Sequence, residues 1–315
     1  MKTEPIKNYK YIFGPVPSRR LGTSLGIDLM PHKTCSLNCI YCECGKTTNL
    51  TTDIKEYVPI AEVKKEIKAY LAINKNIDYI TFSGSGEPTL HSKIGEIINF
   101  LKDNYPQYKI ALLTNGTLFY KKNVIDQVIN ADVIIPSLDA VSEKNFKKIN
   151  RPCPSLDINK IIEGLTLLRK KFKGKLLLEV FIIPEINDNK EELEKIKDAA
   201  FLIAPDKIQV NTLDRPGTEL DVEPIDKASV EKITKFFANA EFISNNKRGG
   251  KNCFNEDIEN NEDKILSAIK RRPCTIEDII KFTGIKKEEA EKIINNFQKN
   301  HKIKITKLKR GVFFH

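Results

Sequence analysis

Three cysteines stand close together near the start of the chain, in the segment HKTCSLNCIYCECG. Cys35, Cys39 and Cys42 form a C-x3-C-x2-C pattern, and Tyr41 directly precedes the third cysteine. Three thiolates on one short loop can ligate three irons of a cubane iron–sulfur cluster and leave the fourth iron open. An iron without a protein ligand is free to bind a reactant, so the pattern predicts a reactive cluster.

A structural zinc site is the alternative for this loop, with Cys44 or His32 as the fourth ligand. Structural zinc sites usually combine two separated pairs of ligands, and the spacing here departs from that arrangement. The remaining cysteines, Cys153, Cys253 and Cys274, are scattered along the chain. We expect a cytoplasmic location, where a disulfide framework is unlikely to persist. The scattered cysteines therefore predict neither disulfides nor a second cluster.

The elements that position this loop follow a repeated β/α pattern. Short β-branched runs at residues 24–29, 79–82, 109–113, 133–135, 176–183 and 207–210 alternate with stretches whose apolar residues recur at three-and-four spacing. Such alternation predicts a parallel sheet covered by helices, either an open doubly wound sheet or a barrel. Polar clusters such as SGSGEPTL and TNG follow the predicted strands, and the carboxyl ends of parallel strands form the ligand site in both architectures.

Composition divides the chain into two domains. Residues 1–240 carry the β/α pattern, residues 241–261 form a polar linker containing Gly249 and Gly250, and residues 262–315 form a basic domain. The net charge is +10, and 14 Lys and Arg against 7 Asp and Glu place +7 of it in residues 262–315. No run approaches the roughly 18 apolar residues that a membrane-spanning helix needs, and no signal peptide is evident. We therefore expect a soluble cytoplasmic protein that does not enter a membrane.

The basic domain has the pattern of a winged helix, with three short helices followed by a hairpin. Its third helix carries Glu288, Glu289 and Glu291, which would repel DNA phosphates. Base reading in the major groove relies on Arg, Asn and Gln instead. Sequence-specific DNA binding by this helix is therefore disfavoured.

Taken together, the cysteine loop and the segment Ser83–Leu90 resemble the radical S-adenosylmethionine (SAM) superfamily. The second segment is similar to the glycine-rich GGEP motif of that superfamily, with Ser85 in place of one glycine. The resemblance extends over residues 11–220. The segments FGPVPSRRLGTSLGIDL, LLTNG, PSLDA, NRP, EVFIIPEIND and NTLDRPG resemble the Fe–S oxidoreductase branch that includes the wyosine (tRNA imidazoguanosine) synthases.

This resemblance implies a partial (β/α)6 TIM-like barrel with a [4Fe–4S] cluster on the three cysteines. SAM would chelate the open iron, and its reductive cleavage would give a 5′-deoxyadenosyl radical that abstracts hydrogen from a substrate. A small reductant protein of the ferredoxin or flavodoxin type is the implied electron donor. The chain has no cysteine before Cys35, whereas wyosine synthases carry further N-terminal cysteines for a second cluster. This departure puts imidazoguanosine synthesis itself in doubt.

The resemblance also implies a set of cofactor contacts. Gly84, Ser85 and Gly86 would let the backbone approach the methionine amino group. Glu87 would accept hydrogen bonds from that group or close the loop. The other implied cofactor contacts are an aromatic side chain, polar residues and an apolar residue at strand ends: Tyr41, Asn115, Ser137 or Asp139, Ile183 and Asn211.

Three arginines are candidates for binding an anionic substrate, because a guanidinium fork matches carboxylate and phosphate geometry. They are Arg19, Arg20 and Arg215, and since the first two are adjacent we expect at most one of that pair to point inward. The first functional hypothesis is a radical SAM enzyme acting on RNA, such as tRNA, docked by the basic domain. The second keeps the chemistry and makes the substrate a peptide, a protein or a small metabolite. The third is a metal-dependent DNA-binding regulator.

Overall fold

A curved, eight-stranded sheet forms the larger part of the computed structural model, which describes residues 9–243 and 261–315. The predicted linker lies almost wholly outside these ranges, as does Cys253. The strands run in the order β1 (Ile12–Ser18), β2 (Gly22–Ile27), β5 (Tyr79–Phe82), β6 (Lys109–Thr114), β7 (Val133–Pro136), β8 (Lys175–Phe181), β9 (Lys207–Asn211) and β10 (Ala240–Phe242). From β2 to β10 all neighbours pair in parallel.

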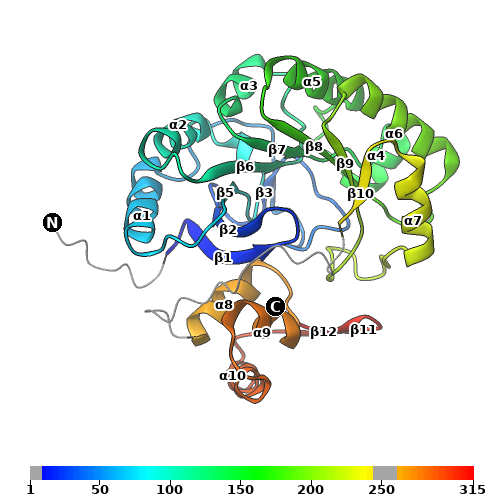
Figure 1. Cartoon of the computed structure of the whole chain (residues 1–315). Coiled ribbons are helices and arrows are strands. Elements are labelled where there is room, and N and C mark those ends of the chain that lie inside the picture. Colours follow the sequence, from blue (N-terminus) through cyan, green and yellow to red (C-terminus); the bar gives the residue numbers. More distant parts are fainter. Residues whose placement is uncertain (1–8, 244–260) are drawn as a thin grey trace.

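Helices follow the parallel strands and cover the outer face of the sheet (Figure 1). They are α1 (Ile60–Ile73), α2 (Ile94–Asn104), α3 (Lys122–Val128), α4 (Glu143–Asn150), α5 (Ile158–Lys171), α6 (Lys190–Ile203) and α7 (Lys227–Phe236). Most begin at a residue whose side chain accepts a backbone N–H, as at Asp157 before α5 and Asn189 before α6. The repeated β/α units that the sequence predicts are confirmed.

The sheet is open, because its edge strands β1 and β10 do not pair with each other within the described residues. The expected parallel α/β fold is thus observed, in the curved form that a partial barrel requires. Two strands of this sheet were not predicted from the sequence. Strand β1 pairs with β2 antiparallel and contains a bulge between Phe13 and Val16, while β10 is only three residues long. Short or irregular edge strands carry little periodicity, so pattern alone does not reveal them.

Apolar side chains pack on both faces of the sheet, which explains why its strands lack alternation. The larger cluster fills the space between sheet and helices, with Ile67, Ile97 and Leu165 from the helices against Phe82 and Leu178 from the strands. A smaller cluster lies apart from it: Leu21, Ala111, Val133, Ile135 and Leu177. Polar residues lie at the carboxyl ends of the strands instead.

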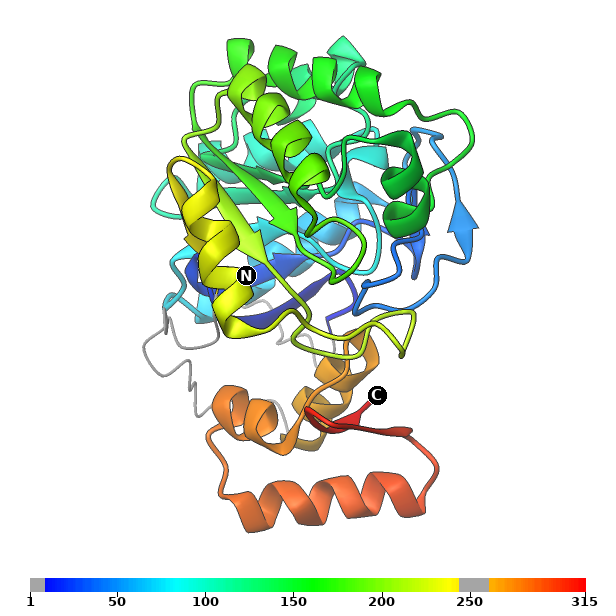
Figure 2. The same ribbon diagram turned by 90° about the vertical axis from the view of Figure 1, so that its right-hand side faces the viewer.

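Residues 262–315, called here the C-terminal domain, have a hydrophobic cluster of their own that includes Ile265, Ile279, Ile294 and Phe297. This domain contains α8 (Asn261–Arg271), α9 (Ile276–Thr283), α10 (Lys287–Lys299) and the antiparallel strands β11 (Ile305–Leu308) and β12 (Gly311–Phe314). A capping box at Thr275 begins α9, and Gly284 ends it in the left-handed conformation. The domain lies beside the barrel, near β1 and β2 (Figures 1 and 2).

Three helices and a hairpin therefore follow in the expected order. A winged-helix relationship for this domain stays a prediction. Among the described helices, none has the length and apolar character that crossing a membrane requires.

Candidate active site

The cysteine loop lies between β2 and α1, where its strand β3 (Thr34–Cys35) pairs with β4 (Asn49–Leu50). The segment after α4 runs antiparallel beside it. Asn38 N–H donates to Asn150 O over 2.9 Å, Ile40 N–H donates to Ile149 O over 2.9 Å, and Leu37 bridges Pro152. Backbone hydrogen bonds with the NRP segment and the residue before it thus hold the cysteine loop in place.

Each of the three cysteine sulfurs accepts a hydrogen bond from a different nitrogen. Asn115 Nδ2 lies 3.5 Å from Cys35 Sγ, and Asn150 Nδ2 lies 3.4 Å from Cys39 Sγ. Lys33 Nζ lies 3.0 Å from Cys42 Sγ. Donors of this kind stabilise thiolates and orient metal ligands. Lys33 and Asn150 escaped sequence reasoning, although both stand in segments that the resemblance covers.

The electrostatic surroundings of the sulfurs are unequal. Burial raises the pKa of Cys35 to about 12 and raises the pKa of Cys39 well above its ordinary value. A hydrogen bond from Cys44, together with the charge of Lys33, lowers the pKa of Cys42 to about 5. Buried thiols ligate as thiolates only when a metal supplies compensating positive charge.

This donor set fits an iron–sulfur cluster, with one sulfur available for each of three irons. In the described ranges, no group of three His, Cys, Asp or Glu side chains surrounds a point for a single ion. His32 is exposed, and Cys44 Sγ contacts Gly84 O at 3.6 Å. Cys35, Cys39 and Cys42 are the residues that would hold the cluster.

The glycine-rich loop after β5 packs directly on the cysteine loop. Lys33 N–H donates to Ser85 O over 2.9 Å, and Glu87 N–H donates to Thr34 O over 3.1 Å. A Cβ on Gly86 would lie 2.2 Å from Thr34 O, so this approach requires glycine. The two sequence motifs therefore form one continuous surface.

Asp28, at the end of β2, holds the first half of the glycine-rich loop. Its Oδ2 accepts from Ser85 N at 3.0 Å and from Ser85 Oγ at 2.8 Å. Gly84 has φ +153°, and a Cβ there would lie 2.2 Å from the Asp28 Cγ. The serine that replaces a glycine of the family motif thus supplies a hydroxyl donor to a buried carboxylate.

Glu87 closes the loop, which is one of the two roles expected for it. Its Oε1 accepts from Thr89 N, Thr89 Oγ1 and Thr114 Oγ1, the last two at 2.6 Å, and its Oε2 accepts from Asn115 N at 2.7 Å. The carboxyl group is buried, and burial raises its pKa. Its acceptor oxygens therefore join the loop to the end of β6.

Tyr41 is held by Asp139 and Phe181. The Tyr41 hydroxyl donates to Asp139 Oδ2 over 2.6 Å, and its ring stacks on Phe181 with centroids 3.9 Å apart. Asp139 also accepts from Asn150 Nδ2 at 2.7 Å and from Phe181 N at 3.0 Å. In this structure Asp139 therefore positions Tyr41, and Phe181 is a neighbour of the site that strand-end reasoning missed.

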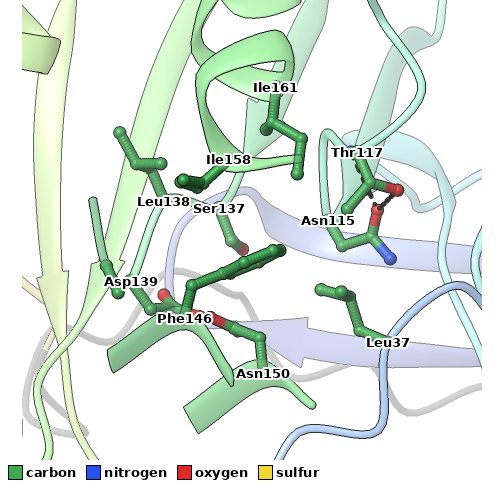
Figure 3. A pocket seen from close by; sticks show the side chains of 11 residues that line it. Leu37, Asn115, Thr117, Ser137, Leu138, Asp139, Phe146, Asn150, Ile158 and Ile161 are labelled. Atoms are coloured by element: carbon green, nitrogen blue, oxygen red, sulfur yellow. Dashed lines mark hydrogen bonds between the residues drawn. The ribbon is translucent and has the colours of Figure 1, made fainter. Parts of the chain in front are cut away.

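Three of the expected cofactor residues, Asn115, Ser137 and Asp139, line one pocket together with Leu37 and Asn150 (Figure 3). The side chain of Asn115 is fully engaged, because its Nδ2 also donates to Ser36 Oγ and its Oδ1 accepts from Thr117. The structure thus brings these residues together beside the cysteine loop. Their contacts with SAM stay predictions.

Ile183 and Asn211 are both buried near the ends of β8 and β9. Ile183 N–H donates to Asn187 Oδ1 over 2.7 Å, which folds the turn after β8 back on itself. Asn211 Oδ1 accepts from Thr212 N at 3.0 Å. Both have structural partners, and contact with adenine stays a prediction for each.

All three candidate substrate arginines are engaged in ion pairs. Arg19 pairs with Asp214 at 2.9 Å, and the more buried Arg20 pairs with Glu179. Arg215 pairs with Asp278 of the C-terminal domain at 3.0 Å and with Glu43 at 3.5 Å. A substrate anion would have to compete with these carboxylates, so substrate binding by these arginines stays a prediction.

Comparison with known proteins agrees with this site. A profile of the Radical SAM superfamily matches residues 29–200. The chain is 35% identical to the UPF0026 protein MJ1312 of Methanocaldococcus jannaschii, and the match covers 90% of each protein. It is 40% identical over 89% of its length to a protein named GTPase Obg of Brachyspira hyodysenteriae, but spans only 39% of that longer protein.

Among solved structures, TYW1 with a lysine-pyruvate adduct bound has a similar fold. The TM-score is 0.51 at 16% identity, over 71% of this chain and 74% of TYW1. Fold, cysteine loop and profile match confirm what the two motifs predict. The chain belongs to the radical SAM superfamily of enzymes, which use a [4Fe–4S] cluster and SAM.

Proposed function

We propose that this enzyme acts on RNA, with tRNA as the first substrate class to test. With the cluster on Cys35, Cys39 and Cys42, SAM at its open iron would supply a 5′-deoxyadenosyl radical that abstracts hydrogen from the substrate. The protein's own residues orient the cofactors and exclude water from them. A ferredoxin-type or flavodoxin-type protein is the proposed electron donor, and the cytoplasm is the proposed location.

The observation that carries the RNA proposal is a basic hairpin. Lys302, Lys304, Lys307 and Lys309 are all exposed on and beside β11. Closely spaced exposed lysines bind a phosphate backbone through counterion release. The exposed Glu288, Glu289 and Glu291 of α10 disfavour groove reading by that helix, whereas residues 302–314 contain no acidic side chain.

The hairpin also lies close to the barrel. Arg310, at its turn, pairs with Glu223 at 3.3 Å and donates to Arg215 O over 3.4 Å. Both partners belong to the loop after β9, at the carboxyl edge of the sheet. A nucleic acid bound along the lysines would therefore be led toward the edge that carries the cofactor loops.

The chemistry is tested first. Anaerobically reconstituted protein should form 5′-deoxyadenosine from SAM with dithionite, and Cys39→Ala should abolish it. Substrate class is tested separately, by measuring tRNA binding across a range of salt concentrations. Replacing the four hairpin lysines by Gln should lower the slope of log K against log salt by about 3.

The matched control replaces four exposed lysines at the start of α10 and along it: Lys286, Lys287, Lys292 and Lys299. This variant loses the same charge and should leave the slope nearly unchanged. Equal loss in both variants would indicate general charge attraction. The absence of tRNA binding at low salt would contradict the RNA proposal.

A second candidate substrate is a small polar molecule, favoured by the guanidinium group of Arg20, whose side chain is 10% exposed and pairs with Glu179. Here the hairpin variant should turn over its substrate as fast as the wild type. The hypothesis of a DNA-binding regulator loses its support, because the chain belongs to an enzyme superfamily.

A further inference from the structure

Two ion-pair bridges join the C-terminal domain to the loops that serve the cofactors. The first runs from Arg271, the last residue of α8, to Asp28 at the end of β2. Arg271 Nη1 lies 3.1 Å from Asp28 Oδ2, and the guanidinium lies 4.4 Å from the centre of the Phe13 ring. Stacking on a ring fixes the plane of the guanidinium and so its direction.

Asp28 connects Arg271 to the glycine-rich loop. The same Oδ2 that pairs with Arg271 accepts both donors of Ser85, and Oδ1 accepts from Met30 N at 3.2 Å. The carboxylate is buried, with 7% of the residue exposed. A buried carboxylate without a partner cation is costly, so the contact with Arg271 stabilises Asp28 in its place against Gly84.

The second bridge runs from Asp278, in the first turn of α9, through Arg215 to Glu43. Asp278 accepts from Arg215 Nε at 3.3 Å and from Nη2 at 3.0 Å, which is a two-point contact. The remaining Nη1 lies 3.5 Å from Glu43 Oε2. Glu43 directly follows Cys42, so this bridge ends beside the third cluster ligand.

Contacts within the C-terminal domain fix the positions of Arg271 and Asp278, from which the two bridges begin. Asp278 belongs to the capping box of α9, where its Oδ2 also accepts from Thr275 N at 3.2 Å. The buried Ile269 and Ile279 hold α8 and α9 in one cluster, so Arg271 and Asp278 have a common frame. Figure 2 shows α8 and α9 on the side of this domain that faces the barrel, with α10 on the far side.

We infer that the C-terminal domain holds two loops of the active site in position. Arg271 acts through Asp28 as a positioning residue for the Gly84–Ser85 loop. Asp278 acts through Arg215 as a positioning residue for the segment after Cys42. The inference rests on the family assignment and is independent of the RNA proposal, because it concerns SAM binding and loop order rather than substrate.

The test uses the full chain and hydrogen exchange of the protein before cluster loading. Arg271→Met should speed exchange of the Ser85 amide several-fold and leave residues 42–45 unchanged. Asp278→Asn, which keeps an acceptor for Thr275, should speed exchange in residues 42–45 and leave Ser85 unchanged. Lys270→Met and Glu277→Gln remove exposed charges next to the two residues and should leave both segments as in the wild type.

If each variant speeds hydrogen exchange in its own segment only, the two residues position those segments, and a general loss of structure is excluded. If either variant loosened both segments equally, the effect would be undocking or unfolding of the domain, and the inference would be overturned. It would equally be overturned if neither variant changed its own segment. After reconstitution, Arg271→Met should bind SAM about tenfold more weakly than Lys270→Met, because Asp28 would no longer be held against the Gly84–Ser85 loop. Equal SAM affinities would contradict the first bridge even if deoxyadenosine formation had failed for other reasons.

Discussion

Asn150 joins a cluster ligand to the residue that positions Tyr41. Its Nδ2 lies 3.4 Å from Cys39 Sγ and 2.7 Å from Asp139 Oδ2, and its backbone carbonyl accepts from Asn38 in the cysteine loop. One buried amide therefore holds the sulfur, the carboxylate and the loop backbone in register.

Replacing Asn150 by Leu should weaken retention of the cluster by about 10–100-fold, because a donor to a ligand sulfur is lost from a buried site. The measurement is the iron remaining after a fixed anaerobic challenge with a chelator. Asn130→Leu is the control, since Asn130 bonds to Asn99 on the surface. Equal retention in both variants would show that the Asn150 contact does not support the cluster.

The ligand set should consist of three cysteines. Cys39→Ser should contain little iron and sulfide after reconstitution, whereas Cys44→Ser should bind nearly as much as the wild type. The reason is that the Cys44 thiol serves as a hydrogen-bond donor, to Gly84 O and to Cys42, while Asn150 supports Cys39. Loss of the cluster in Cys44→Ser would point to a fourth protein ligand and remove the open iron.

Lys33 should raise the reduction potential of the cluster. It is a buried cation 3.0 Å from Cys42 Sγ, and burial opposes its charge, yet the neighbouring thiol raises its pKa above the ordinary value. Positive charge beside a ligand sulfur favours the reduced, more negative cluster. A redox titration followed by electron paramagnetic resonance should therefore show a lower potential in Lys33→Met. The exposed Lys46→Met should keep the wild-type value.

Removing the Tyr41 hydroxyl should destabilise the fold without unstacking the ring. In Tyr41→Phe the buried Asp139 loses one of its three donors, and a lost buried hydrogen bond costs about 1–3 kcal/mol. Chemical denaturation measures the change. Tyr120→Phe, at a half-buried tyrosine away from the cysteine loop, serves as the control. A free energy of unfolding equal to that of the wild type would contradict this role for Asp139.

Glu192 should make stability depend on acid pH. Burial opposes its charge, but hydrogen bonds from Ser142, Val141 and Asn145 hold the pKa of this carboxyl below its ordinary value of 4.5. A lowered pKa in the folded state means that its stabilisation is complete above pH 4.5 and is lost as the pH falls through the folded pKa.

Glu192→Gln should therefore be less stable than the wild type at neutral pH by about 1–3 kcal/mol, with a shallower loss of stability toward acid pH. Denaturation at several pH values measures both effects. Glu191→Gln, at the neighbouring exposed position, should retain the slope of the wild type. Identical acid slopes in wild type and Glu192→Gln would contradict the prediction.

The three-cysteine pattern, the glycine-rich loop and the order of β/α units could all be recognised from the chain alone. Each depends on residues close in sequence: the cysteines lie within eight positions, and strand and helix periods repeat within about a dozen residues. The resemblance offered loop closure as one of two roles for Glu87, whose donors include the nearby Thr89 and the more distant Thr114 and Asn115.

Folding in three dimensions was needed to identify the partners of these residues. Asn150 is 111 residues from Cys39, and Arg271 is 243 residues from Asp28, so no local pattern relates them. The edge strands β1 and β10 were missed likewise, because pairing with a neighbour defines them more than their own periodicity. Packing and hydrogen bonding between distant segments set which donor meets each sulfur and which carboxylate meets each arginine. Local sequence could indicate the chemistry of the site, while long-range contacts determined how the site is held.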